Sequence, residues 1–165
     1  MKKSLAVLLF VGLLCLCACS VPLKSVAFEP LKSFSADITG THGEFAFAGT
    51  LTVNSEQDIT LCFSAPEGIA GFKLTLGDGG FYADVLGVED FTPLEELPDD
   101  SLVKLLLCAV RQAVFYQRDF VSQTNKEKIA SFTQCGKQMS ANYDADGTLT
   151  RLACKEATLT CEIHH

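Results

Sequence analysis

Residues 45–53 read FAFAGTLTV, and this stretch decides the fold class. Phe, Phe, Gly, Leu and Val occupy every second position, and Ala or Thr fills the positions between them. A period of two places successive side chains on opposite faces of an extended chain. The stretch therefore predicts a β-strand with one apolar face.

The same period of two recurs on both sides of this strand. Upstream and immediately downstream, the pattern predicts strands at 34–39, 59–64, 72–76 and 81–86. Short segments rich in Gly, Asn and Asp connect them, with a hairpin loop at 40–43 and turns at 54–57 and 78–80. Four more strands are predicted at 128–134, 138–143, 148–154 and 158–163. The chain is thus expected to be mainly β (α+β), with about nine antiparallel strands.

One helix interrupts the strands after Pro98. Apolar residues then follow helical spacing: Leu102, Val103, Leu106, Ala109, Val110, Ala113 and Val114. Lys104, Arg111 and Arg118 recur every seven residues on the other side. We expect one amphipathic helix of about five turns, capped by Asp99 or Asp100, with its apolar face packed on the sheet. Insertion into lipid is less favoured, because the basic stripe carries only three charges.

The N-terminus has the pattern of an export signal. Lys2 and Lys3 precede an uncharged run from residue 5 to 19, which at 1.5 Å per residue is too short to cross a hydrocarbon core of roughly 30 Å. The run ends in Leu16-Cys17-Ala18-Cys19, which resembles the bacterial lipobox. That resemblance implies cleavage before Cys19 and a diacylglyceryl group on its thiol. Ordinary secretion is the alternative, because residues 18–20 also fit a small-x-small cleavage site.

These features divide the chain into three parts: a signal peptide at 1–18, a lipidated N-terminus and short tether at 19–33, and one folded domain at 34–165. Export predicts attachment to the outer face of the cytoplasmic membrane, or to an outer membrane if the envelope has one. The whole chain has 165 residues and a net charge of −7. Without residues 1–18 it has eleven basic and twenty acidic residues, a net charge of −9. No basic run is present to bind nucleic acid.

No catalytic or metal-binding motif occurs in the sequence. His42 lies in a predicted hairpin loop, and the carboxylates between Glu89 and Asp100 flank a Pro-containing connection, which is typical of a solvated surface. Residues 144–147 lack the acidic spacing of a calcium loop. We therefore expect a chain that is not an enzyme and needs no cofactor or metal. Cys62 and Cys108 are expected in the core. One disulfide among Cys135, Cys154 and Cys161 is left open.

The run from residue 34 to about 118 resembles the LolA/LolB-type lipoprotein carriers. The similar features are at 34–36, 49–53, 63–68, 71–74 and 97–98. The resemblance implies a curved, open antiparallel half-barrel covered by helix, and LolB-type proteins are themselves lipid-anchored. Two features depart from the family: Pro22 and Pro30 lie where LolA-type proteins carry a lid helix, and the chain has no Trp.

Two functions follow, and the sequence leaves both open. In the first, the concave face binds acyl chains or lipoproteins, and its cavity is lined by Phe45, Phe47, Gly49, Leu51, Phe63, Phe72, Leu74 and Phe81. Ile69, in the loop at 65–70, would then contact the membrane. In the second, the same residues form a filled core, and a monomeric interaction or sensor lipoprotein binds a protein partner through its acidic surface. Gly49 marks either a bulge in the sheet or a gap left for a ligand.

Overall fold

The computed structural model describes residues 28–116, 119–123 and 126–165. Their strands form one open antiparallel sheet in the order β6-β5-β4-β3-β2-β1-β11-β10-β9-β8-β7. The strands are β1 Phe34–His42, β2 Phe45–Val53, β3 Ile59–Ala65, β4 Lys73–Gly77, β5 Gly80–Val85, β6 Val88–Pro93, β7 Asp119–Gln123, β8 Glu127–Gln134, β9 Lys137–Asp144, β10 Leu149–Cys154 and β11 Leu159–His164. A mainly β fold with antiparallel pairing is therefore confirmed.

The sheet has eleven strands, two more than expected. The additional strands, β6 and β7, are its two edges, and each pairs with one neighbour only. Residues 88–91 of β6 are exposed, so no buried face imposes apolar alternation on them. The sequence predicted a solvated connection here; the exposure of residues 88–91 agrees with it, but the segment pairs with β5 as a strand.

The only α-helix of the described ranges is α2, Leu102–Phe115, which has 14 residues and about four turns rather than five. Ser101, not Asp99 or Asp100, is its N-cap: the Ser101 hydroxyl accepts a hydrogen bond from the Lys104 backbone N–H at 3.4 Å. Asp99 instead forms an ion pair with the Lys104 side chain. Arg118 of the predicted basic stripe lies outside the described residues.

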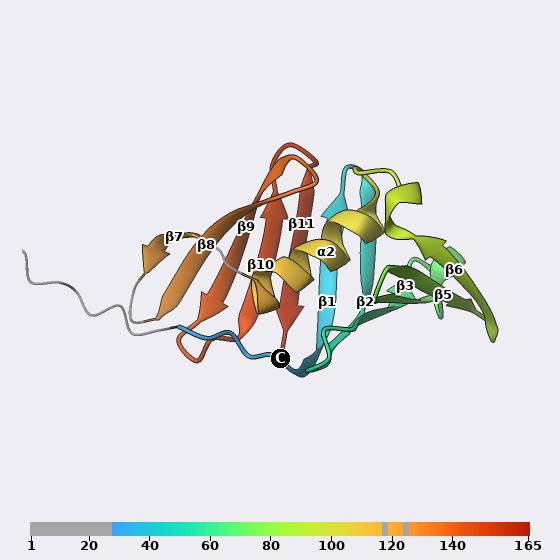
Figure 1. The fold of residues 1–165 in the computed structure, drawn as a ribbon, viewed down its shortest axis with the longest axis horizontal. Coiled ribbons are helices and arrows are strands. Elements are labelled where there is room, and N and C mark those ends of the chain that lie inside the picture. The colour runs from blue at the N-terminus through green and yellow to red at the C-terminus, as the bar shows by residue number, and fades with distance from the viewer. Residues whose placement is uncertain (1–27, 117–118, 124–125) are drawn as a thin grey trace, which may run out of the picture.

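The helix α2 lies across one face of the sheet (Figure 1). It contacts β3 and β4 in one half of the sheet and β8 and β10 in the other half. Because the same helix touches both halves, the sheet bends around it. The core is the layer between helix and sheet, where every second residue of the central strands is buried.

The described ranges also contain two short 3₁₀ helices, η2 at Glu67–Ile69 and η3 at Leu94–Glu96. The hairpin loop predicted at 40–43 is shorter in the structure, because β1 ends at His42 and β2 begins at Phe45. Leu86, predicted in a strand, lies in the β5–β6 turn. At 144–147 the Asp144 side chain accepts from the backbone N–H groups of Asp146 and Thr148, as in a hairpin turn. Within the described part of the chain, no helix is long and apolar enough to cross a membrane.

Candidate functional site

The concave face, the predicted ligand cavity, is occupied by α2. Phe47, Leu51, Phe63 and Phe81 are buried in one core cluster with the helix residues. Phe72 and Leu74 are half-buried and pack against that cluster. Phe45, at the start of β2, lies on the same face and its ring stacks on that of Phe47 with centroids 6.5 Å apart, but at the strand end it is 40% exposed. The sequence therefore grouped most of these side chains on the correct face, and the structure places them against α2.

Gly49 lies at a bulge. The register between β2 and β3 shifts between Ala48 and Gly49. A Cβ atom on Gly49 would lie 2.4 Å from the carbonyl oxygen of Cys62 on the neighbouring strand. The absence of a side chain thus allows close approach of two backbones, and the bulge alternative is correct.

The helix α2 is buried on almost all sides. Residues 104–110 are all buried, which covers nearly two full turns. The fully buried apolar side chains of α2 include Leu105, Leu106 and Leu107, on three different sides of the helix. An amphipathic helix lying on a flat sheet would leave one of these sides in solvent. The connection at 94–101 contributes to this burial, because Leu94 and Leu97 pack against the core cluster.

Polar side chains attach α2 to the sheet. The Arg111 guanidinium donates hydrogen bonds through Nη2 to the carbonyl oxygens of Leu76 at 3.1 Å and Gly77 at 3.0 Å, at the end of β4. On the other half of the sheet, the buried Tyr143 hydroxyl donates to the Ala113 carbonyl at 2.8 Å. Hydrogen bonds from a charged donor to backbone are among the stronger ones. These contacts hold the helix at both halves of the sheet, and Arg111 is therefore not part of a solvent-facing stripe.

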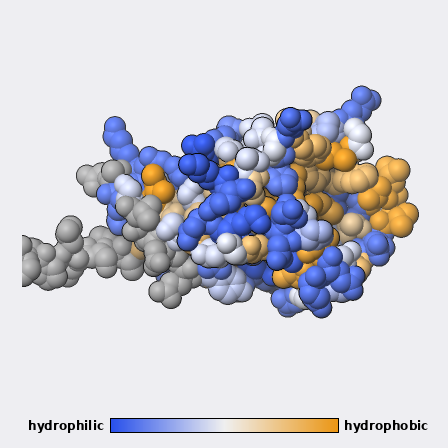
Figure 2. All heavy atoms as spheres, turned by 90° about the horizontal axis from the view of Figure 1, so that it is seen from above, coloured by the Kyte–Doolittle hydropathy of each residue, from blue (hydrophilic) through white to orange (hydrophobic). Residues whose placement is uncertain are grey.

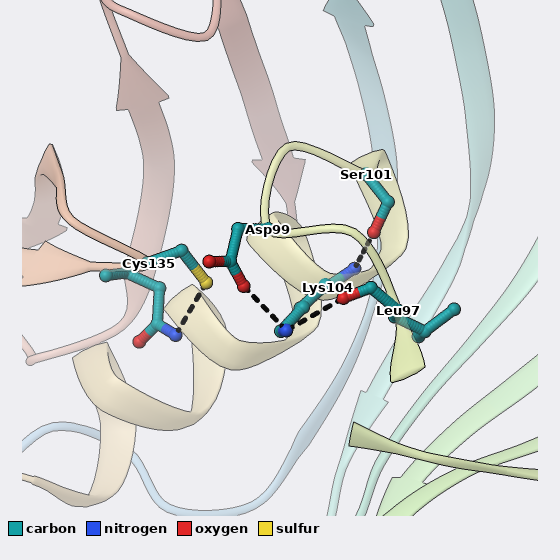
Figure 3. A network of polar contacts seen from close by, with 6 residues as sticks. Leu97, Asp99, Ser101, Lys104 and Cys135 are labelled. Carbon is teal, nitrogen blue, oxygen red and sulfur yellow. Dashed lines mark hydrogen bonds and ion pairs between the residues drawn. The ribbon is translucent and has the colours of Figure 1, made fainter. Parts of the chain in front are cut away.

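Lys104 fixes the start of the helix (Figure 3). Its Nζ donates to Asp99 Oδ1 at 2.7 Å and to the Leu97 carbonyl at 2.9 Å. The Lys104 residue is only 8% exposed, whereas the Asp99 side chain is 69% exposed. The hydrogen bond to Asp99 raises the pKa of Lys104, and the same bond lowers the pKa of Asp99. The expectation that Lys104 belongs to an exposed stripe was wrong, because the connection at 94–101 folds over it.

We expect the change of Lys104 to methionine to lower the thermal midpoint clearly at neutral pH, because it removes both hydrogen bonds of Nζ. Because the pKa of Asp99 is lowered, its ion pair stabilises the folded protein at every pH above the pKa of an unfolded aspartate. This stabilisation is lost as the pH falls through the pKa of Asp99 in the folded protein. Because the pKa of Lys104 is raised, its charge stabilises the folded protein at every pH below the pKa of an unfolded lysine. This stabilisation is lost as the pH rises through the pKa of Lys104 in the folded protein. The difference in midpoint between wild type and variant should therefore be widest between these limits. A difference independent of pH from acid to alkali would contradict the ion pair.

Two hollows lie on the opposite, convex face of the sheet. The larger, of about 820 Å³, crosses a row of small side chains in register on five neighbouring strands: Ser131, Ser140, Ala153, Thr160 and Thr41. The second, of about 360 Å³, adjoins it at β1 and β2 and is lined in part by Phe47. Phe47 is the one predicted cavity residue that lines either hollow. The space of these hollows therefore opens away from α2.

The cysteines of residues 28–165 are free thiols, so the disulfide that the sequence left open is not formed. Cys108 is buried in the core as expected, but Cys62 is exposed, because it alternates with Leu61 and Phe63 on β3. Burial raises the pKa of Cys108 to about 11 and of Cys161 to about 12. Thiols of this kind are inert at neutral pH. Within the described ranges no cluster of three or more His, Cys, Asp or Glu side chains has the arrangement of a metal site.

The most prominent apolar feature was missed by the sequence reasoning. Ile69, the residue predicted to contact a membrane, is half-buried and packs against the core. Leu86, at the tip of the β5–β6 hairpin, is 98% exposed, and Val88 beside it is 71% exposed. The hairpin extends from one end of the sheet, and hydrophobic side chains cover this end in Figure 2. A Leu-Gly pair between two valines could have signalled a two-residue turn, but a turn with Leu in first place is unusual.

The remaining candidate, Cys19, which the sequence predicts to be lipidated, lies outside the described residues, as does the whole signal segment. The described chain begins at Phe28, whose ring contacts that of Tyr143 on β9 at 5.2 Å between centroids. Leu31 donates its backbone N–H to the Gly147 carbonyl at 3.0 Å. The segment that would follow a lipid anchor thus enters the domain beside β9 and β10.

Comparison with known proteins gives a distant likeness in fold. No family model and no curated protein matches the chain in sequence. Among solved structures, the fold is similar to that of a LolA superfamily protein from Nitrosomonas europaea, with a TM-score of 0.40 and 8% identity. The match covers 83% of this chain and 86% of that one. A likeness at this level assigns neither a family nor a function.

Proposed function

We propose that this chain is an exported, lipid-anchored and non-catalytic protein whose domain binds a protein partner in the cell envelope. The observation that carries the proposal is the filled concave face: α2 occupies the space in which an acyl chain would have to lie. The anchor is supported by the signal-like segment and the lipobox pattern ending at Cys19. The domain would then act as an interaction module on the surface of a membrane.

The energetics favour this function over acyl-chain transport. A bound chain would have to displace α2 and expose its large, fully buried side chains, each of which contributes about 1.5–3 kcal/mol. These side chains are Leu105, Leu106, Leu107, Val110 and Val114. The contacts of Arg111 and Tyr143 would be broken as well. An acyl chain taken from a bilayer offers no compensating gain, because it already lies in an apolar medium.

The Cys19→Ala variant tests the anchor. Two acyl chains are needed for stable attachment, so a protein without the lipidated thiol should leave the membrane fraction or stay unprocessed. The measurement is fractionation of cells that express each form, with the Cys17→Ala variant as the matched control. Cys19→Ala protein that is normally processed and still bound to membranes would contradict lipidation at this residue.

The released Cys19→Ala protein also tests the filled core. We expect no saturable binding of a fluorescent fatty acid and no lipid that co-purifies in stoichiometric amount by mass spectrometry. Saturable fatty-acid binding that persists when side chains of the convex face are changed would overturn the proposal in favour of acyl-chain binding.

A further inference from the structure

The turn at the tip of the β5–β6 hairpin has a residue that folding alone does not favour. Leu86 has a φ of 54° and Gly87 a φ of 82°, so both central residues are left-handed. Asn, Asp and Gly are the usual residues at such positions, and a bulky side chain there is uncommon. The Gly87 N–H bonds to Asp84 Oδ1 at 2.9 Å, which closes the turn without any contribution from the Leu86 side chain. A conformationally costly, 98% exposed leucine indicates a role outside the fold.

Other exposed apolar side chains accompany Leu86. Val88 is 71% exposed and follows the turn directly. Tyr82 and Phe91 face each other across β5 and β6, with ring centroids 5.0 Å apart, and each is 46% exposed. The register places Val88 with Val85 on one face of the hairpin and Tyr82 with Phe91 on the other, with Leu86 at the tip between them. We call Tyr82, Leu86, Val88 and Phe91, which lie on both faces of the hairpin, the hairpin patch. Exposed hydrophobic side chains that gather in one place mark an interaction surface more often than isolated ones.

Acidic side chains outnumber basic ones around the hairpin patch: Asp84, Glu89 and Asp90 lie on β5 and β6, and Lys73 on β4 lies opposite Asp84. Residues 74–103 contain eight acidic side chains and no lysine or arginine: Asp78, Asp84, Glu89, Asp90, Glu95, Glu96, Asp99 and Asp100. Most of the excess negative charge of the chain is therefore concentrated in this segment. A surface of this sign attracts basic partners and repels anionic ones.

We propose that the hairpin patch docks on a protein surface where apolar side chains are bordered by lysine or arginine. A lipid surface is disfavoured, because insertion of Leu86 would bring Glu89 and Asp90 to the headgroups, which repel them where lipids are anionic. The anchored end is also remote from the tip, since Phe28 enters beside β9 while β5 and β6 lie at the other end of the sheet (Figure 1). This assignment rests on the proposed function, and it names the surface and the partner chemistry.

The chain has no tryptophan, so a single Trp reports on the tip. In the Cys19→Ala protein we would introduce Val88→Trp and titrate a synthetic amphipathic helix of leucine and lysine, the same peptide with glutamate for lysine, and vesicles of phosphatidylcholine with or without phosphatidylglycerol. We expect a saturable blue shift of emission with the lysine peptide alone. The control is Glu44→Trp, at an exposed position in the β1–β2 turn, and its emission should not shift.

Leu86→Asn separates binding from folding, because Asn suits the left-handed turn and should keep or raise the thermal midpoint. Its affinity for the lysine peptide should fall about tenfold, as expected for the loss of one buried leucine. Glu89→Gln with Asp90→Asn should also weaken binding and reduce its dependence on salt. The assignment would be overturned if Leu86→Asn bound the lysine peptide as tightly as the parent protein, or if the lysine peptide did not bind at all. It would also be overturned by a blue shift of Val88→Trp with vesicles, or by an equal shift of Glu44→Trp with the lysine peptide. Fatty-acid binding, by contrast, would remove the proposed function and leave the tip result unchanged.

Discussion

Replacing Leu106 by aspartate should lower the free energy of unfolding by at least about 4 kcal/mol. Leu106 is fully buried between α2 and the sheet. An aspartate there would be a buried charge without a partner, and the apolar contacts of leucine would be lost as well. Because small domains are stable by only about 5–15 kcal/mol, such a loss would leave much of the protein unfolded at 37 °C.

Urea or thermal denaturation of the purified Cys19→Ala protein measures this effect. Leu106→Met is the matched control, since it keeps the volume and should cost less than about 1.5 kcal/mol. A result in which aspartate and methionine cost the same would mean that this side of α2 is not packed on the sheet.

Replacing Gly49 by alanine should cost about 1–3 kcal/mol or more. The new Cβ would lie 2.4 Å from the Cys62 carbonyl oxygen, which belongs to a backbone and cannot rotate away. The two strands would have to separate at the bulge, and this would weaken the hydrogen bonds between β2 and β3. The effect is expected although alanine adds a single methyl group.

Gly68→Ala is the matched control for this change. No atom lies within 4 Å of a Cβ at Gly68 in η2, so the substitution is free of clashes. It should be neutral or stabilise by up to about 1 kcal/mol, because alanine reduces the conformational entropy of the unfolded chain. Equal free energies of unfolding for the two variants would contradict the close approach at Gly49. If Gly49→Ala instead kept full stability and altered ligand binding, the ligand-gap alternative would replace the bulge.

The local pattern was sufficient for the elements with a buried face. Alternation in residues 45–53 predicted β2 and which of its side chains share the inner face, and of these only Phe45, at the strand end, is exposed. The apolar spacing after Pro98 likewise predicted α2 and the burial of Leu106. Burial of one face imposes a period on the sequence, and that period can be recognised without the structure.

Where no buried face exists, the sequence carried little signal. The edge strand β6 is exposed and acidic, and it reads as a solvated connection until its pairing with β5 is seen. Leucine at position 86 is compatible with a strand, and only its left-handed backbone angle shows that it lies in a turn. The candidate interaction surface therefore depends on the pairing of β6 with β5 and on the left-handed backbone of Leu86, and alternation encodes neither.

The sequence by itself determined nine of the eleven described strands, the single described α-helix, the acidic charge of residues 74–103 and the signal-like N-terminus that ends at Cys19. Tertiary structure alone decided whether the concave face is open or filled. The same apolar residues serve a core or a cavity, and the outcome depends on how far the sheet bends around α2 and on what covers its outer side. Lys104 shows this most directly: helical spacing placed it in solvent, but the connection at 94–101 folds over it and supplies the Asp99 and Leu97 oxygens that it binds. A contact of this kind arises from the path of a loop in space, which no local period records.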